Sequence, residues 1–288
     1  MSTAAIRIIE TPTREAATEV MLYPLGDTHV GALGFDEQEF ARYVNEIESN
    51  DNAYWLGLGD YGDLITHKDP RYLPTIYEDW MYTPQALADP GTAQRDYFLE
   101  MTRPIWHKCL GLIEGNHEAT MKKHLTRDIF REIAGTIEAN NPWSDLAFGP
   151  QKWVMLKFRQ RGQTAPTNTA TVWAFHGSGG GAFTNTNKSR AYAASHKANV
   201  IITGHTHKEV VFPDYFEEVD RAGNVRIVPI RAVVSGTFKQ HGPWEESKGF
   251  QPNGTGTSYL VFRPWHRVYG GGSSDEGFHL RRSIEVRI

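Results

Sequence analysis

Short apolar runs, each followed at once by polar residues, recur along the first two thirds of the chain. Three of them have the length of buried strands: Val20–Leu25, Ala53–Leu58 and Leu110–Ile113. Between the first two, apolar side chains recur at helical spacing, at Phe40, Val44 and Ile47, and Asp36 is the expected N-cap because Glu39 follows three residues later. This alternation of strands and a helix predicts an α/β fold. Pro24 is awkward for a central strand, because it has no N–H to donate.

Residues 64–92 interrupt this rhythm, because they carry four prolines and several aromatic side chains. We interpret them as an excursion over the C-terminal edge of the sheet, since long irregular segments in compact domains are often functional lids. The aromatic side chains between Tyr72 and Tyr82 either form a small core of the excursion or stack on nucleotide bases. Helical stretches are expected at 93–107 and at about 120–138.

The second half of the chain is mostly β. Strands are expected at Lys152–Phe158, Thr169–Phe175 and Val200–Thr203, with a helix at 186–197. Beyond residue 207, further strands are expected at 208–216, 224–235, 257–263 and 278–287. The segment Met1–Thr18 lacks the apolar stretch of a secretory signal, and we expect it to be mobile or to pair with a sheet edge.

The composition excludes several classes of protein. The 288 residues, 40% of them hydrophobic, suit one large globular domain or one domain with an insertion. A net charge of −4 gives no global basic field that would hold duplex nucleic acid. No run of about 18 apolar residues occurs, so no membrane partner is expected. The single cysteine, Cys109, excludes an intrachain disulfide, and we expect a reducing, cytoplasmic compartment.

Five polar motifs stand at or just beyond the ends of the expected strands. In chain order they are Asp27-x-His29, Gly59-Asp60-x-x-Asp63, Gly115-Asn116-His117-Glu118, His176 and His205-x-His207. Each motif alone is weak, because a loop histidine or a capping aspartate is an ordinary feature. Catalytic residues are nevertheless expected at the C-terminal ends of successive strands in α/β sheets. The motifs therefore predict one shared site.

The side chains in these motifs suit divalent metals such as Mn, Fe or Zn. Seven of them are candidate ligands: Asp27, His29, Asp60, Asn116, His176, His205 and His207. Seven ligands exceed what one catalytic ion with an open position needs. They fit two ions that share one carboxylate.

Taken together, the five motifs resemble those of the calcineurin-like metallophosphoesterase superfamily over residues 20 to about 210, and the run from His176 to Gly181 is similar to that of virus-encoded members. The resemblance implies a four-layer αββα fold, a two-sheet β-sandwich flanked by helices. Residues 1–288 would form a single domain, with the excursion at about 64–92 as a lid. Residues 208–288 would complete the second sheet.

The resemblance also implies a role for each side chain. Asp27, His29 and His207 would hold the first ion. Asn116, His176 and His205 would hold the second, and Asp60 would bridge the two. His117 would lie beside the substrate phosphoryl group and Asp63 would orient it, since a carboxylate behind an imidazole fixes the ring and raises its pKa. Manganese is the expected metal, with Fe, Zn or Ni as alternatives.

The implied reaction is hydrolysis of a phosphate ester by a hydroxide that bridges the two ions. A protonated His117 would stabilise the developing charge or donate a proton to the leaving oxygen. The expected partner is therefore a phosphate-ester substrate.

Three substrate classes compete: phosphodiesters of DNA or RNA, small nucleotides, and phosphomonoesters including phosphoproteins. The basic cluster from Lys122 to Arg127 and the aromatic excursion favour nucleotide phosphodiesters, as in a nuclease or phosphodiesterase, although the basic cluster could equally be a solvated helix face. Asp63 stands where the superfamily's DNA-repair nucleases often have His, which argues against a close relationship to them. The alternative from a different class is a non-catalytic scaffold that binds proteins.

Three further features of the sequence have more than one interpretation. Glu118 is expected to support the site or to begin a helix rather than to act directly. The loop Gly177–Gly181 either lets substrate approach the backbone or simply turns the chain, and it lacks the lysine of a nucleotide-binding P-loop. The segment Gly236–Gly242 could fold back near the site, which singles out His241.

Overall fold

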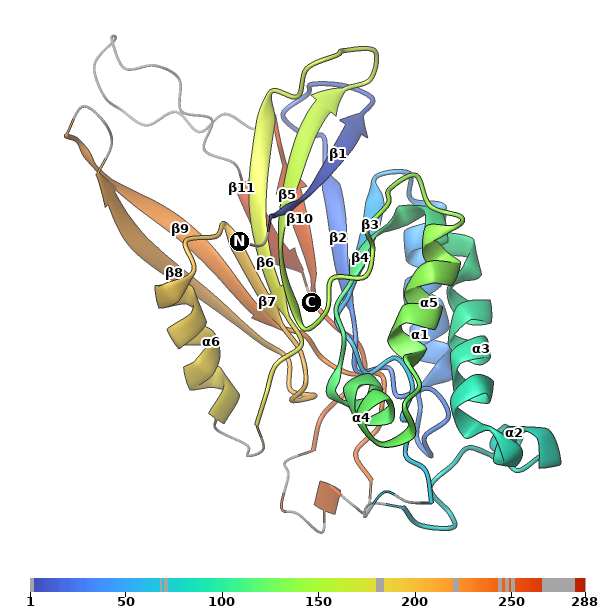
Figure 1. Ribbon diagram of the computed structural model, residues 1–288. Helices are drawn as coiled ribbons and strands as arrows, with labels where there is room; N and C mark the ends of the chain where they lie inside the picture. The colour runs from blue at the N-terminus through green and yellow to red at the C-terminus, as the bar shows by residue number, and fades with distance from the viewer. Residues whose placement is uncertain are drawn as a thin grey trace.

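Two β-sheets pack face to face and helices cover their outer faces, which gives four layers (Figure 1). The computed structural model describes residues 3–67, 69, 72–179, 184–219, 223–242, 245–246, 249, 252–265 and 283–287. The predicted fold class, an α/β sandwich of two sheets flanked by helices, is confirmed.

The first sheet has five strands in the order β11-β10-β2-β3-β4. Their bounds are β2 Val20–Leu25, β3 Ala53–Gly57, β4 Cys109–Leu112, β10 Tyr259–Arg263 and β11 Ser283–Arg287. The three strands from the first half are parallel, and β10 and β11 are antiparallel additions. Pro24 is tolerated inside β2 because β10 pairs only with residues 20–22, so the missing N–H of Pro24 falls beyond that ladder.

The second sheet has six strands in the order β1-β5-β6-β7-β9-β8. Their bounds are β1 Ala5–Thr11, β5 Gln151–Gln160, β6 Asn168–Phe175, β7 Val200–Thr203, β8 Val210–Val219 and β9 Val225–Val234. β6, β7 and β9 are parallel. β1 pairs in parallel with β5 at one edge, so of the two expectations for the N-terminal segment, edge pairing is confirmed.

Helices cover the outer face of each sheet (Figure 1). The first sheet is covered by α1 Glu37–Ser49, α3 Pro90–Thr102 and α5 Ile129–Glu138, and the second by α6 Thr184–Ser195. Shorter helices are α2 Pro84–Ala88, α4 Asn116–Leu125 and the 3₁₀ segments Asp79–Met81 and Arg103–Lys108. As predicted, the side chain of Asp36 caps α1 by accepting a hydrogen bond from the Glu39 amide at 3.1 Å. None of the described helices combines the length and apolar character that crossing a membrane requires.

The main core lies between the two sheets. Alternate residues of β5 point into it, so that Val154, Leu156 and Phe158 are buried. They meet inward-facing side chains of the first sheet, including Leu22 and Leu260. This apolar layer fixes the two sheets against each other. It also fixes the strand ends that carry the polar motifs.

Two predictions about the elements were wrong. The helical stretch expected at 120–138 is two helices, because Thr126 adopts a left-handed backbone conformation (φ 55°) and Asp128 caps a new helix by accepting from the Arg131 amide at 3.1 Å. Residues 208–288 do not all complete the second sheet, since β10 joins β2 in the first sheet. Of the strand expected at 278–287, the part before Ser283 lies outside the described residues.

The excursion at 64–92 has a small apolar core of its own. Tyr77, Met81 and Ala86 are buried in it, and Trp80 stacks on Tyr97 of α3 with ring centroids 4.5 Å apart. Tyr72, Tyr77 and Trp80 thus follow the first of the two alternatives, a small core, whereas Tyr82 is 43% exposed. The excursion is shorter than expected, because Pro90 already begins α3.

Candidate metal centre

The candidate ligands come together where the strands of both sheets end. Asp27 and His29 follow β2, Asp60 follows β3, and Asn116 is the first residue of α4 just after β4; His176 follows β6, and His205 and His207 follow β7. Because these strands are parallel within each sheet, their C-terminal ends share one edge. The structure therefore brings all seven predicted ligands to one edge of the sandwich.

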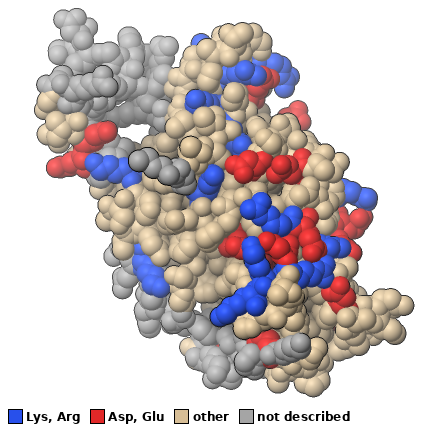
Figure 2. Space-filling model, viewed as in Figure 1, with Lys and Arg blue, Asp and Glu red and all other residues tan. Residues whose placement is uncertain are grey.

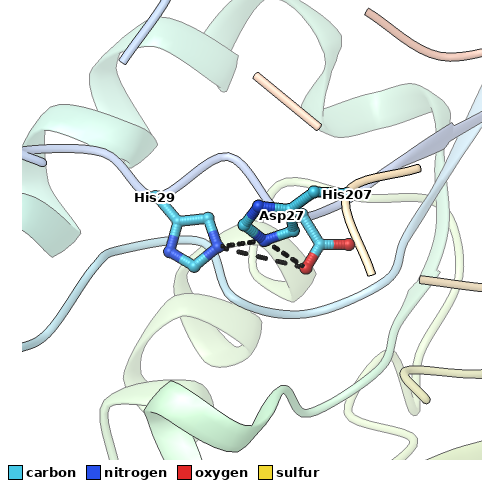
Figure 3. Close-up of side chains that lie close together, drawn as sticks. All are labelled: Asp27, His29 and His207. Carbon is cyan, nitrogen blue, oxygen red and sulfur yellow. Dashed lines mark hydrogen bonds and ion pairs between the residues drawn. The ribbon is translucent and has the colours of Figure 1, made fainter. Parts of the chain in front are cut away.

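One group of donors consists of Asp27, His29 and His207 (Figure 3). The Nε2 atoms of the two histidines lie 2.9 Å apart, and Oδ1 of Asp27 lies 3.5 Å from Nε2 of His207 and 4.0 Å from Nε2 of His29. Two donors on one ion at about 2.0–2.2 Å from it lie roughly 3–3.5 Å apart. The spacing of this group suits a shared cation.

A second group consists of Asp60, His176 and His205. Nε2 of His176 lies 3.2 Å from Oδ2 of Asp60 and 3.0 Å from Oδ1 of Asn116. Nδ1 of His176 donates to the Leu58 carbonyl at 2.6 Å, which leaves the Nε2 lone pair for a cation. Asn116 thus adds a neutral oxygen to this group.

Asp60 stands between the two groups. Its Oδ2 atom lies 3.2 Å from Nε2 of His176 and 4.0 Å from Nε2 of His29. Its other oxygen, Oδ1, accepts a hydrogen bond from the His117 amide at 2.9 Å. One carboxylate oxygen therefore faces histidines of both groups, which is the position of a bridging ligand.

The two carboxylate oxygens of Asp27, like those of Asp60, have different surroundings. Oδ2 accepts from the His205 amide at 2.8 Å, and Oδ1 is buried with no hydrogen-bond partner in the described part of the chain. A buried carboxylate oxygen without a partner is costly, and a cation would satisfy it. On this test the residues fit a divalent metal.

The backbone at these positions is unusual. In the described chain, eight non-glycine residues have positive φ, and five of them are candidate ligands: Asp27, His29, Asp60, His205 and His207. This left-handed conformation is disfavoured for residues with a side chain, and such strain gathers at functional sites. The sharp turns it creates direct successive side chains into the same small volume.

The protonation of the site follows from its burial and charges. Burial lowers the pKa of His29 to about 4, against the opposing effect of its hydrogen bond with Asp63, so the ring is neutral at pH 7. Burial alone would raise the pKa of Asp60, but the charges of His176 and His117 hold it well below its usual range. The neutral imidazole of His29 and the ionised carboxylate of Asp60 are forms that bind metals. Against the effect of burial, Asp60 raises the pKa of His176 to about 10, so a cation would have to displace a proton from that ring.

Asp63 and His117 lie where the motifs placed them, and the backbone of Asp63 makes the contact between them. The carboxylate of Asp63 bonds His29, with Oδ1 3.1 Å from Nδ1, while His117 directs its Nδ1 at the backbone carbonyl of Asp63. Asp63 thus holds His117 through its main-chain carbonyl rather than through its carboxylate, although a carboxylate oxygen lies within 4.8 Å of a ring nitrogen of His117. That the Asp63 carboxylate orients His117 stays a prediction. Nε2 of His117 lies 3.9 Å from Oδ2 of Asp60, at the site.

Glu118 is buried beneath the site. Its carboxylate accepts hydrogen bonds from the amides of Asp60, Tyr61 and Gly115 at 2.9, 2.7 and 3.0 Å. Burial and the charge of Asp60 raise the pKa of Glu118 to about 7. The expectation that Glu118 supports the site and begins a helix agrees with this geometry, since α4 starts at Asn116.

The segment after β9 also supports the site, which the sequence predicted only in part. Residues 236–242 fold back toward the site, where Thr237 Oγ1 and the Phe238 amide both donate to the Asp27 carbonyl, at 2.8 and 3.1 Å. The sequence offered one signal for Thr237, namely its place just beyond a strand end. His241 lies two residues past Lys239 in the same segment, and its Nδ1 atom is buried.

Two members of the basic cluster at the end of α4 are paired with acidic side chains. Arg127 bonds Asp89 at 2.9 Å and Glu132 at 2.8 Å, and Lys122 bonds Asp128 at 2.6 Å. Basic and acidic side chains are accordingly mixed on this face of the molecule (Figure 2). The pairing of Lys122 and Arg127 favours the solvated helix face over a field for substrate phosphates.

No protein-family model and no curated protein matches the chain. Among solved structures, it is similar to a predicted phosphoesterase from Streptococcus pneumoniae (12% identity, 94% of this chain and 99% of that chain, TM-score 0.35). It is also similar to Vps29 complexed with Zn²⁺ from Entamoeba histolytica (10%, 94% and 98%, TM-score 0.39) and to a metallophosphoesterase from Sphaerobacter thermophilus (13%, 86% and 84%, TM-score 0.36). Likenesses this distant assign neither an activity nor a metal to the chain.

Proposed function

We propose that this chain is a metal-dependent phosphoesterase that holds two divalent cations and hydrolyses phosphodiesters of nucleotides or nucleic acid. The observation that supports this most is the position of Asp60. One oxygen of its buried carboxylate faces His29 of one donor group and His176 of the other. A single-ion site needs no such shared oxygen, whereas a two-ion site does.

The donors divide between two ions. Asp27, His29 and His207 would hold the first, and Asn116, His176 and His205 the second, with Asp60 common to both. Bound there, the ions would supply positive charge for a phosphoryl group under attack and the acidity that makes water a nucleophile near neutral pH. We propose manganese, with Fe, Zn or Ni as alternatives, because the donors are imidazole nitrogens and carboxylate or amide oxygens.

His117 is the proposed acid of the reaction. Its ring is buried and held by the Asp63 carbonyl at Nδ1, so that Nε2 faces the site near Oδ2 of Asp60. A carbonyl can only accept, so Nδ1 carries a proton in this arrangement. A second proton, on Nε2, would stabilise negative charge on the phosphoryl group or pass to the leaving oxygen.

The charges around the site support a diester as substrate. Burial would raise the pKa of Asp63, but its hydrogen bond with His29 and the charges of His117, His29 and, least of all, Lys239 hold that pKa below its usual range. The ammonium group of Lys239 is already paired with Glu245. A monoester carries almost two negative charges and a diester one, so the diester needs less positive charge from side chains beyond that of the two proposed cations.

The test compares two chromogenic substrates, a bis-aryl phosphate and the corresponding aryl phosphate, with Mn²⁺ and after chelation. We expect faster turnover of the diester, loss of turnover with a chelator and recovery on adding Mn²⁺. The Asp60→Asn variant is the control for a contaminating phosphatase, because turnover at this site must be lost with the carboxylate that both donor groups share. Faster turnover of the monoester would indicate a phosphomonoesterase. Bound metals with no turnover of either substrate would indicate a non-catalytic scaffold.

A further inference from the structure

Glu118 joins two loops that each carry a candidate ligand. It lies in the first turn of α4 and is 1% exposed. Oε2 accepts from the amides of Gly115 and Asp60, and Oε1 accepts from the amide of Tyr61. The first bond caps its own helix. The other two reach across to the loop after β3, so one buried carboxylate connects two strand ends.

The loop after β3 also makes a hydrogen bond back to the turn that begins α4. Asp60 returns a bond to the other loop, because its Oδ1 accepts from the His117 amide at 2.9 Å. With Oδ1 engaged and its own amide bound to Glu118, the Asp60 carboxylate is left with Oδ2 to face both donor groups. The orientation of the bridging oxygen therefore depends on contacts made by Glu118.

The two loops are also in direct contact. A Cβ atom at Gly115 would lie 2.2 Å from the Asp60 amide nitrogen, and one at Gly59 would lie 2.5 Å from the Gly115 nitrogen. Neither position can accept a side chain without a shift of backbone. The backbones of the two loops are thus as close as glycine allows, and the carboxylate of Glu118 bridges the same junction.

We propose that Glu118 is a positioning residue that sets the separation of the two cation positions by holding the backbone of Asp60 against the turn that carries Asn116. This inference rests on the proposed two-metal function. It concerns the geometry of the ion pair and not the chemical step. A glutamine has the shape of Glu118 but only one accepting oxygen. It can retain the bonds to Gly115 and Asp60 while its NH₂ group faces the N–H of Tyr61.

The test uses the full chain loaded with two equivalents of Mn²⁺ and measured by electron paramagnetic resonance. Two ions at the expected separation give the spectrum of an exchange-coupled pair, whereas a single ion gives the six-line signal of isolated Mn²⁺. We expect the coupled spectrum in the wild type. In Glu118→Gln we expect the six-line signal at equal loading and roughly 10–100-fold weaker binding of one ion, the usual effect of losing a partner behind the ligands.

Glu138→Gln is the matched control. Glu138 also accepts a bond from a backbone amide, that of Leu146 at 2.9 Å, but this contact lies in the loop after α5 and touches no candidate ligand. Both variants lose a carboxylate bonded to main chain, so a purely structural effect would appear in both. Circular dichroism establishes that each variant is folded, and Glu118→Asp, which is one methylene too short to reach the loop after β3, serves if Glu118→Gln does not fold.

The possible results distinguish the positioning role of Glu118 from the proposed two-metal function. A coupled pair in the wild type and in Glu138→Gln that is lost in Glu118→Gln or Glu118→Asp supports the positioning role. An unchanged coupled spectrum and unchanged affinity in the Glu118 variants overturn it and leave the proposed function standing, as does an equal loss in Glu138→Gln. A wild type that binds no second ion overturns the proposed function itself, and the positioning role with it.

Discussion

Oδ1 of Asp63 lies 3.1 Å from Nδ1 of His29, while the main-chain carbonyl of Asp63 accepts a hydrogen bond from Nδ1 of His117. A carboxylate behind a metal-binding imidazole fixes its tautomer, so that Nε2 carries the lone pair that faces the ion. Burial keeps the ring neutral, with a pKa lowered to about 4. The Asp63 carboxylate is therefore placed to act on the proposed first metal position through His29, while its main-chain carbonyl holds His117.

Replacing Asp63 tests this division of roles. We expect Asp63→Asn to weaken binding of one ion by roughly 10–100-fold, because the neutral amide polarises His29 less than a carboxylate does. The Asp63 carbonyl remains, so the rate at saturating metal should change little. The measurement is a metal titration against a competing chelator, followed by kcat at saturating Mn²⁺. Unchanged metal affinity with a reduced kcat would show that the carboxylate acts through His117 instead.

Replacing His117 should lower the reaction rate without removing the bound metals. We expect His117→Asn to reduce kcat by ~10²–10⁴-fold, the range for losing a general acid, because its Nε2 faces the site. Two ions per chain should remain, as its ring nitrogens belong to neither proposed ligand set. Elemental analysis and steady-state kinetics on one preparation measure both quantities. A variant with full activity would remove His117 from the mechanism.

Replacing Asp60 should weaken the binding of both metal ions together. We expect Asp60→Asn to abolish activity and to leave fewer than one ion per chain after dialysis, because the shared negative oxygen is lost from both positions. Asp96→Asn is a suitable control, since Asp96 is an exposed residue of α3 paired with Arg95. Retention of two ions by Asp60→Asn would mean that the two positions are held independently.

Replacing two glycines by alanine should have opposite effects on the stability of the fold. Gly115→Ala should destabilise the fold and weaken metal binding, because the added Cβ would lie 2.2 Å from the Asp60 amide nitrogen and Oδ1. Gly135→Ala should stabilise it by roughly 0.5–1 kcal/mol, since Gly135 lies inside α5 with open space around it. Thermal unfolding of both variants measures this difference. Equal effects would show that the contact between the two loops is not tight.

The placement of the ligands could be predicted because it follows from the strands. Asp27, Asp60 and His176 each come within a few residues of the end of an apolar run, and parallel strands bring such positions to one edge. The distance between the ligands carried by the first sheet and those carried by the second could not be predicted in the same way. It depends on the apolar layer between the sheets, in which residues more than a hundred positions apart interdigitate.

The finer contacts could not be predicted, because they depend on backbone turns that no residue pattern specifies. Leu64 adopts a left-handed backbone directly after Asp63, and leucine is an unusual residue for that conformation. The break at Thr126, which splits the expected helix, is of the same kind. The pairing of Arg127 with Asp89 and Glu132 is likewise a tertiary contact, so the sequence alone left a substrate-binding role open.

The central claim is that one site holds two cations with Asp60 between them. Crystals grown with Mn²⁺ and measured at the manganese absorption edge test it most directly, because anomalous scattering locates each ion without reference to the protein. We predict two peaks about 3.5–4 Å apart, one beside His29 and His207 and the other beside Asn116 and His176, with the Asp60 carboxylate contacting both. A single peak, or two peaks of which Asp60 touches only one, would contradict the claim.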